Sequence, residues 1–218
     1  MIQVKICGIT NEADARCAAK LGAAALGFIF YSPSPRNISP EDARKIVSAI
    51  PAELVKVGVF VNENVSVVKK IVEYCGLDMI QLHGDETPAY CREFPAAQII
   101  KAVELKNKAD LVNASSYDVA AILVDSRHAG LYGGTGKKAN WELACRIRDK
   151  KPLILSGGIN KDNIAKAIKD VAPNALDINS SVESEPRKKD HAKLAIIFDK
   201  ILHADVEPKE TQLIFVRR

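Results

Sequence analysis

Short apolar segments alternate with longer amphipathic segments along most of the chain. The short segments carry Val, Ile, Leu and Ala at consecutive positions, which predicts strands that are buried on both faces. The longer segments repeat apolar residues at helical spacing, and one of them follows the capping pair Ser39-Pro40. We predict strands at 2–7, 25–30, 54–60, 79–82, 99–103, 119–124, 152–155 and 175–178, and helices at 11–21, 64–74, 86–94, 109–113, 161–171 and 190–202, with two more helices beginning at residues 39 and 140.

The order strand then helix repeats eight times along the chain. Strands joined through a helix run parallel, so the pattern predicts an α/β protein with parallel strands. Eight such pairs in about 200 residues, with no linker between them, favour a single closed (β/α)8 barrel, the TIM barrel. An open doubly wound sheet is the alternative, but eight strands are many for it and no G-x-G-x-x-G follows the first strand.

We assign residues 1–203 to the barrel, which is the catalytic domain, and residues 204–218 to a C-terminal extension. The extension begins with polar residues and ends with an apolar run at 213–216 followed by two arginines. Two interpretations stay open for it: a frayed end, or an added strand or oligomer contact. For the protein as a whole we expect a monomer or a homodimer.

Composition and charge narrow the class of protein. The net charge of +4 is mild and no long Lys/Arg block occurs, so we expect no nucleic-acid partner. No apolar run approaches the roughly 18 residues of a membrane span, and the first predicted strand begins at residue 2, where a signal peptide would otherwise lie. The five cysteines are odd in number and never closely paired, which indicates neither disulfides nor a zinc site. We therefore expect a cytoplasmic protein without metal.

In a parallel barrel the active site lies at the carboxyl ends of the strands. Loops after the last two strands are typical phosphate-binding elements, and the glycine pair after the seventh strand lets backbone N–H groups approach the phosphate oxygens. Each residue also has a simpler interpretation: a buried cysteine, a surface arginine, a hydrogen-bonding histidine, or glycines that only form a tight turn. The strand ends carry Cys7, Arg36, His83, Asp125, Gly157, Gly158, Asn179 and Ser180.

Several motifs together resemble one enzyme family, phosphoribosylanthranilate isomerase. They occur in the family's order and span residues 2 to about 203. A Cys-Gly pair after the first strand together with an Asp after the sixth is the specific part, since other sugar-phosphate barrels share only the glycine loops. The motifs are Lys5-Ile6-Cys7-Gly8-Ile9-Thr10, Ser34-Pro35-Arg36, Gln81-Leu82-His83-Gly84-Asp85-Glu86, Leu123-Val124-Asp125-Ser126, Gly133-Gly134-Thr135-Gly136, Ser156-Gly157-Gly158-Ile159 and Asp177-Ile178-Asn179-Ser180.

The resemblance implies an Amadori rearrangement of a small phosphosugar, N-(5-phosphoribosyl)anthranilate, in tryptophan biosynthesis, without cofactor or metal. It implies that Asp125 is the general acid that opens the furanose ring and that Cys7 is the general base that removes the C2′ proton. It implies that Arg36 binds the anthranilate carboxylate and that Gly157, Gly158 and Ser180 bind the phosphate, with His83 and Asn179 as further substrate-binding residues.

The chain departs from the family at two places, and other functions stay open. Arg187 stands where the family usually has glycine, and the C-terminal extension has no counterpart in the family. A related isomerase of histidine biosynthesis shares the barrel and phosphate loops but has an aspartate in place of Cys7. A bifunctional enzyme and a non-catalytic phosphosugar-binding barrel are the remaining alternatives, although the latter has no need for Cys7 together with Asp125.

The proposed acid and base raise a problem of protonation. From reference pKa values, only a few molecules in about 10⁵ hold a thiolate at Cys7 and a protonated Asp125 together at pH 7. We expect Asp125 to carry most of the required shift, because desolvation under a glycine-rich lid at 130–136 favours its neutral form. Lys5 lies two residues before Cys7 on the same strand face and could favour the thiolate; its simpler interpretation is a buried ion pair with Asp177.

Overall fold

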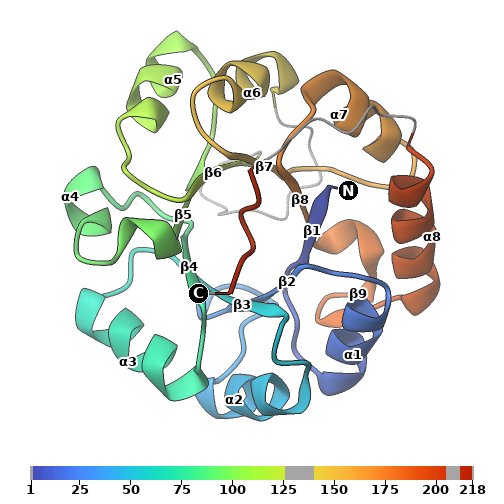
Figure 1. Cartoon of the computed structure of the whole chain (residues 1–218). Helices are drawn as coiled ribbons and strands as arrows, with labels where there is room; N and C mark the ends of the chain where they lie inside the picture. The colour runs from blue at the N-terminus through green and yellow to red at the C-terminus, as the bar shows by residue number, and fades with distance from the viewer. Residues whose placement is uncertain (1, 126–139, 205–211, 218) are drawn as a thin grey trace.

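The computed structural model describes residues 2–125, 140–204 and 212–217. Eight parallel strands form one closed barrel in sequence order, and helices surround it (Figure 1), which confirms the predicted (β/α)8 fold. The strands are β1 (Gln3–Ile6), β2 (Ala25–Ile29), β3 (Val55–Phe60), β4 (Met79–Leu82), β5 (Ile99–Val103), β6 (Ala121–Val124), β7 (Leu153–Leu155) and β8 (Ala175–Ile178). The helices are α1 (Glu12–Lys20), α2 (Pro40–Ala49), α3 (Val65–Cys75), α4 (Pro88–Cys91), α5 (Lys108–Ser115), α6 (Trp141–Arg148), α7 (Ile164–Val171) and α8 (His191–Leu202), with a 3₁₀ turn η1 at Ala96–Gln98.

Two helices are shorter than the sequence predicts. The helix expected at 86–94 is reduced to α4, and the helix expected at 161–171 is α7, which begins three residues later. In the turn before α7, the Asn163 side chain accepts from the backbone N–H of Asn160 (2.9 Å), and the Asn160 side chain accepts from that of Asp162 (2.9 Å). Asparagine side chains that bind nearby backbone in this way compete with helical hydrogen bonds and delay the helix. Within the described ranges, no helix is long and apolar enough to cross a membrane.

The segment between β8 and α8 forms an additional hairpin that the sequence does not predict. It consists of a 3₁₀ turn, η2 (Ser180–Val182), and two short antiparallel strands, β9 (Glu183–Glu185) and β10 (Lys188–Lys189). The turn of this hairpin holds Arg187 at a φ of 79°. This left-handed backbone is easy for glycine and strained for other residues. The loop therefore keeps a glycine-like shape at the position where the family resemblance expects glycine.

Side chains that point into the barrel divide it into an apolar end and a polar end. The apolar part lies toward the amino ends of the strands and comprises Ala25, Val55, Val57, Met79, Ile100, Ala102, Ala121, Leu123, Ile154 and Ala175. The polar part lies toward the carboxyl ends and contains the buried side chains of Lys5, Gln81, His83, Asp125, Ser156 and Asp177.

Residues 212–217, here called the C-terminal segment, cross the amino-terminal end of the barrel (Figure 1). Ile214 and Phe215 are buried in the apolar cluster of the barrel interior, and Phe215 is only 5% exposed. This segment is therefore packed rather than frayed. Hydrogen bonds join it to residues that begin or precede strands: Gln3 to the backbone of Ile214 and Phe215, Asn174 to the Gln212 carbonyl, and Arg217 to the Ala52 carbonyl.

Candidate active site

The glycine loop after β7 and the Asn-Ser-Ser loop after β8 line a cavity of about 150 Å³ at the carboxyl end of the barrel. Gly157 and Gly158 follow β7 with φ values of 78° and 70°, so both hold backbone conformations that side chains disfavour. The structure brings five of the predicted site residues together around this cavity, namely Asp125, Gly157, Gly158, Asn179 and Ser180, which share it with Ser156, Ile159, Asn160, Asp177 and Ser181.

Cys7 lies directly after β1 with its side chain buried inside the barrel. A Cβ atom placed on Gly27 of the neighbouring strand would lie 2.8 Å from Cys7 Sγ and 3.0 Å from Lys5 Nζ. The thiol and the ammonium therefore face the same small space, which exists because β2 carries no side chain there. Burial raises the pKa of the Cys7 thiol, while the nearby Lys5 charge opposes this rise.

Lys5 is fully buried and its Nζ lies 2.7 Å from Oδ1 of Asp177 on β8. The predicted ion pair between these residues is confirmed, and it joins backbone partners of the β1–β8 register. Burial on its own would lower the pKa of Lys5, but the Asp177 carboxylate and the Cys7 thiol outweigh it and raise that pKa. Lys5 is therefore a permanent cation next to the thiol at neutral pH.

Asp125 follows β6, is buried, and contacts a histidine. Nε2 of His83 lies 3.3 Å from Oδ2 of Asp125, and the other ring nitrogen, Nδ1, lies 2.7 Å from Nε2 of Gln81. The sequence predicts His83 as a substrate-binding residue, whereas the structure places it against the predicted acid. Its ring is held between Gln81 and Asp125, so it can fix the orientation of the carboxyl group.

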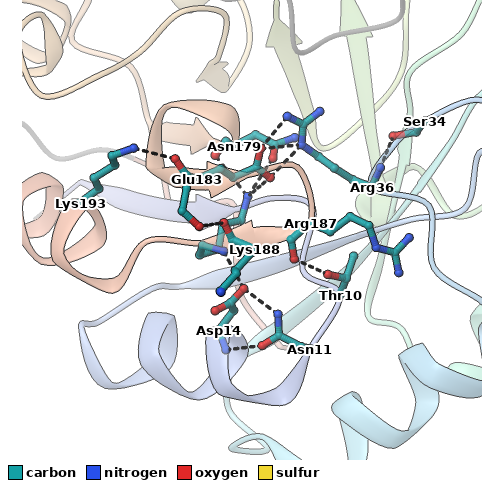
Figure 2. Close-up of polar contacts among 12 residues, drawn as sticks. Thr10, Asn11, Asp14, Ser34, Arg36, Asn179, Glu183, Arg187, Lys188 and Lys193 are labelled. Carbon is teal, nitrogen blue, oxygen red and sulfur yellow. Dashed lines mark hydrogen bonds and ion pairs between the residues drawn. The ribbon is translucent and has the colours of Figure 1, made fainter.

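Arg36 lies in the loop after β2 and forms a two-pronged ion pair with Glu183 of β9 (Figure 2). Arg36 Nε lies 2.8 Å from Glu183 Oε1, and Arg36 Nη2 lies 2.6 Å from Oε2. The Arg36 side chain is only 12% exposed, so the interpretation of a surface arginine is wrong. The hydrogen bond and the charge of Glu183 raise the pKa of Arg36 despite partial burial.

Gly8 lies between the loop that carries Arg36 and the loop after β8 that carries Asn179. Its φ of 73° is left-handed, and a Cβ atom there would lie 2.8 Å from both Arg36 Cδ and Asn179 Oδ1. Only the missing side chain lets the arginine loop and the loop after β8 approach the residue next to Cys7. The residue after Cys7 therefore lies against both the Arg36 side chain and Asn179, a lining residue of the cavity.

The sequence does not identify every residue of this site. Glu183 and Lys189 belong to a hairpin whose strands are too short for a periodic pattern. Gln81 is buried and begins one of the family motifs, but the resemblance implies no role for it in the site. The predicted lid at 130–136 lies outside the described residues. Among the residues that are described, no cluster of three or more His, Cys, Asp or Glu side chains could hold a metal ion.

Parallel strands that gather buried polar side chains at the carboxyl end of a closed barrel place this chain among the (β/α)8-barrel enzymes. Comparison with known proteins narrows the class. Residues 4–200 match the sequence family of N-(5'-phosphoribosyl)anthranilate (PRA) isomerase, so this chain belongs to that family.

Individual relatives agree with this membership. The N-(5'-phosphoribosyl)anthranilate isomerase of Syntrophus aciditrophicus is 53% identical over 197 residues, which cover 90% of this chain and 86% of the relative. The crystal structure of phosphoribosyl anthranilate isomerase from Thermotoga maritima is 43% identical, with a TM-score of 0.85 over 94% of this chain and 98% of that one. A crystal structure of such an isomerase in complex with reduced 1-(o-carboxyphenylamino)-1-deoxyribulose 5-phosphate is 40% identical, with a TM-score of 0.82 over 91% of this chain and 97% of that one.

Proposed function

We propose that this chain converts N-(5'-phosphoribosyl)anthranilate into 1-(o-carboxyphenylamino)-1-deoxyribulose 5-phosphate, an aldose-to-ketose isomerisation of tryptophan biosynthesis. The observation that carries the proposal is the position of Cys7, a buried thiol beside the Lys5 ammonium, whose neighbour Gly8 lies against both Arg36 and Asn179 of the cavity. The reaction needs one acid, one base and an anchor at each end of the substrate. The residues around this cavity can supply all four.

In the proposed reaction Asp125 donates a proton to the furanose ring oxygen, the ring opens, and the anthranilate nitrogen becomes a protonated Schiff base. The Cys7 thiolate then removes the proton from C2′, which gives an enolamine. The Cys7 thiol then returns its proton to C1′ and the C2′ hydroxyl gives its proton to the Asp125 carboxylate, which yields the aminoketose and restores both residues, so no net proton is gained or lost. His83 holds the Asp125 carboxyl group in place from the side opposite its contact with Gln81.

The two anchors in this proposal bind the two charged ends of the substrate. Backbone N–H groups around Gly157 and Gly158, with Asn179 and Ser180 across the cavity, would bind the phosphate. Arg36 would bind the anthranilate carboxylate, since a guanidinium can hold carboxylates on two of its edges. With this small phosphosugar as substrate, we expect the enzyme to act in the cytoplasm as a monomer or a homodimer.

A coupled assay tests the proposal directly. Purified protein is mixed with freshly formed phosphoribosylanthranilate, and the loss of that fluorescent substrate is followed with and without added protein. We expect saturable turnover that inorganic phosphate inhibits competitively. Binding of phosphate without turnover would instead favour the non-catalytic phosphosugar-binding barrel, and turnover that phosphate does not inhibit would contradict the assignment of the glycine loops.

A further inference from the structure

Glu183 is buried between two cations at the edge of the candidate site. One carboxylate oxygen, Oε1, accepts from both Arg36 Nε (2.8 Å) and Lys189 Nζ (3.0 Å), and Oε2 accepts from Arg36 Nη2 (2.6 Å). Burial would raise the pKa of Glu183, but the hydrogen bonds and charges of Arg36 and Lys189 outweigh it and lower that pKa. Glu183 is therefore a fixed carboxylate at neutral pH, not a proton donor.

Lys189 fixes Glu183 from the side away from Arg36. Its Nζ donates to the Asn179 carbonyl (3.2 Å), to Asn179 Oδ1 (2.9 Å) and to Glu183 Oε1 (3.0 Å). Three acceptors match the three hydrogens of an ammonium group. Lys189 therefore links Glu183 to Asn179, which belongs to the loop after β8 that lines the cavity.

The hairpin that carries Glu183 and Lys189 is anchored to α1 (Figure 2). The Asp14 side chain accepts from the backbone N–H of Lys189 (2.7 Å), and its other oxygen lies 2.9 Å from Nε2 of His191. At the turn of the hairpin, the Thr10 hydroxyl donates to the Arg187 carbonyl (2.6 Å). These contacts hold Glu183 in place from the protein side, so the carboxylate is preorganised rather than adjustable.

Glu183 binds one edge of the Arg36 guanidinium and leaves the other edge for a second ligand. The ion pair occupies Nε and one hydrogen of Nη2, and within the described ranges Nη1 forms no hydrogen bond. A guanidinium donates along two bidentate edges, so the Nη1–Nη2 edge stays available to a second carboxylate. Arg36, Glu183 and Lys189 together carry one net positive charge, and a bound carboxylate would neutralise that charge.

We propose that Glu183 is a positioning residue that holds the Arg36 guanidinium in the plane required to bind the carboxylate of the substrate. The inference rests on the proposed function, because it assigns a purpose to the second edge of Arg36. It predicts that Glu183 acts only through Arg36 and only on the carboxylate end of the substrate. We expect the chemical step and the phosphate end, to which Lys189 links Glu183 through Asn179, to change little.

The test compares Glu183→Gln with Glu185→Gln, a control on the exposed part of the same hairpin. A glutamine amide has one acceptor oxygen in place of two, so its NH₂ group would face one of the N–H donors of Arg36 and lose that hydrogen bond. We expect Glu183→Gln to raise KM about 10-fold or more while kcat and the inhibition constant for inorganic phosphate change less than about threefold. Glu185→Gln is expected to behave as wild type.

A double-mutant cycle separates positioning from a general structural role. Arg36→Met removes the guanidinium, so adding Glu183→Gln to it should raise KM little further. Independent, multiplicative effects of the two changes would overturn the inference, as would an unchanged KM in Glu183→Gln. An equal rise in KM and in the phosphate inhibition constant would also overturn it, because that result indicates general distortion.

Two further outcomes distinguish a failure of the inference from a failure of the proposed function. If wild-type protein shows no isomerase activity, the proposed function fails first and the inference with it. If wild type is active and only the Glu183 result fails, the inference alone is wrong. Should Glu183→Gln not fold, as judged by circular dichroism, Glu183→Asp keeps the buried charge but is too short to reach both Nε and Nη2, and the same rise in KM is expected.

Discussion

Lys5 Nζ lies 2.7 Å from Asp177 Oδ1, and this buried ion pair joins the first and last strands of the barrel beside the Cys7 thiol. The pair has two effects on the thiol. The Lys5 charge favours the thiolate, whereas the Asp177 charge opposes it. The proposed base therefore has a pKa that depends on the balance between these two neighbours as well as on burial.

Replacing Lys5 by Met should move the acid limb of the kcat/KM profile to higher pH. A general base acts when it is deprotonated, so activity rises as the pH passes upward through its pKa. Removal of a nearby positive charge raises the pKa of Cys7 further, which leaves less thiolate at neutral pH. We expect kcat/KM at neutral pH to fall severalfold and to recover partly in alkaline buffer.

The variant Asp177→Asn should shift the acid limb of the kcat/KM profile in the opposite direction. It removes a negative charge that raises the pKa of Cys7, so the acid limb should move to lower pH. Both profiles are measured below the melting temperature of each variant, since unpairing a buried charge also destabilises the fold by about 3–5 kcal/mol. Limbs that move in the same direction in both variants would show that charge does not set the pKa of this thiol.

Changes at the proposed acid and base should affect turnover more than binding. We expect Cys7→Ala and Asp125→Asn each to lower kcat by about 10²–10⁴, with KM changed only modestly. Cys17→Ala on the outer helix α1 is the matched control and should retain full activity. Near-normal kcat in Cys7→Ala or in Asp125→Asn would remove that residue from the mechanism.

The left-handed backbone at Arg187 can be tested with two variants that both lose its hydrogen bond to the Asn37 carbonyl. Arg187→Gly relieves the strain at a φ of 79°, whereas Arg187→Ala keeps it. We expect the glycine variant to have a free energy of unfolding about 1 kcal/mol higher than the alanine variant in urea titrations. Equal stabilities would mean that the turn changes its backbone conformation when the arginine is lost.

The sequence predicts the parts of this molecule that repeat. Buried strands and amphipathic helices have a period, and parity along a strand places Cys7 and Lys5 on one face. The hairpin with Glu183 and Lys189 has no such signal, because two- and three-residue strands hold no period and their burial comes from Asp14 and Arg36, which are distant in sequence. Partners of this kind follow only from the folded geometry.

The C-terminal segment was unpredictable for a different reason. Ala25, Ala121 and Ala175 have small side chains toward the amino-terminal end of the barrel, and Phe215 belongs to the same buried cluster. A local pattern of apolar residues does not show where small side chains, distant in sequence, give another segment room to pack. The sequence therefore left open a frayed end or an added strand or oligomer contact, and the described contacts show a segment packed on the barrel.

Packing of this segment predicts a stability effect without a catalytic one. Phe215→Ala should lower the free energy of unfolding by about 3 kcal/mol, because it empties a buried space. Leu213→Ala is the control, since Leu213 is 58% exposed and should change stability by less than about 0.5 kcal/mol. Activity at a temperature below both transitions should stay unchanged, because the segment covers the end of the barrel opposite the candidate site. Loss of kcat in folded Phe215→Ala would contradict this separation.

The position of the C-terminal segment also bears on how the chain is made. Residues 212–217 are synthesised after all eight barrel strands, and the segment binds Gln3 of β1, the first of these strands. A newly made chain therefore passes through a stage in which every strand exists while Val55, Met79 and Ile100 still face an uncovered end. During that interval the barrel has exposed apolar surface that a chaperone can bind, and packing of the C-terminal segment removes it.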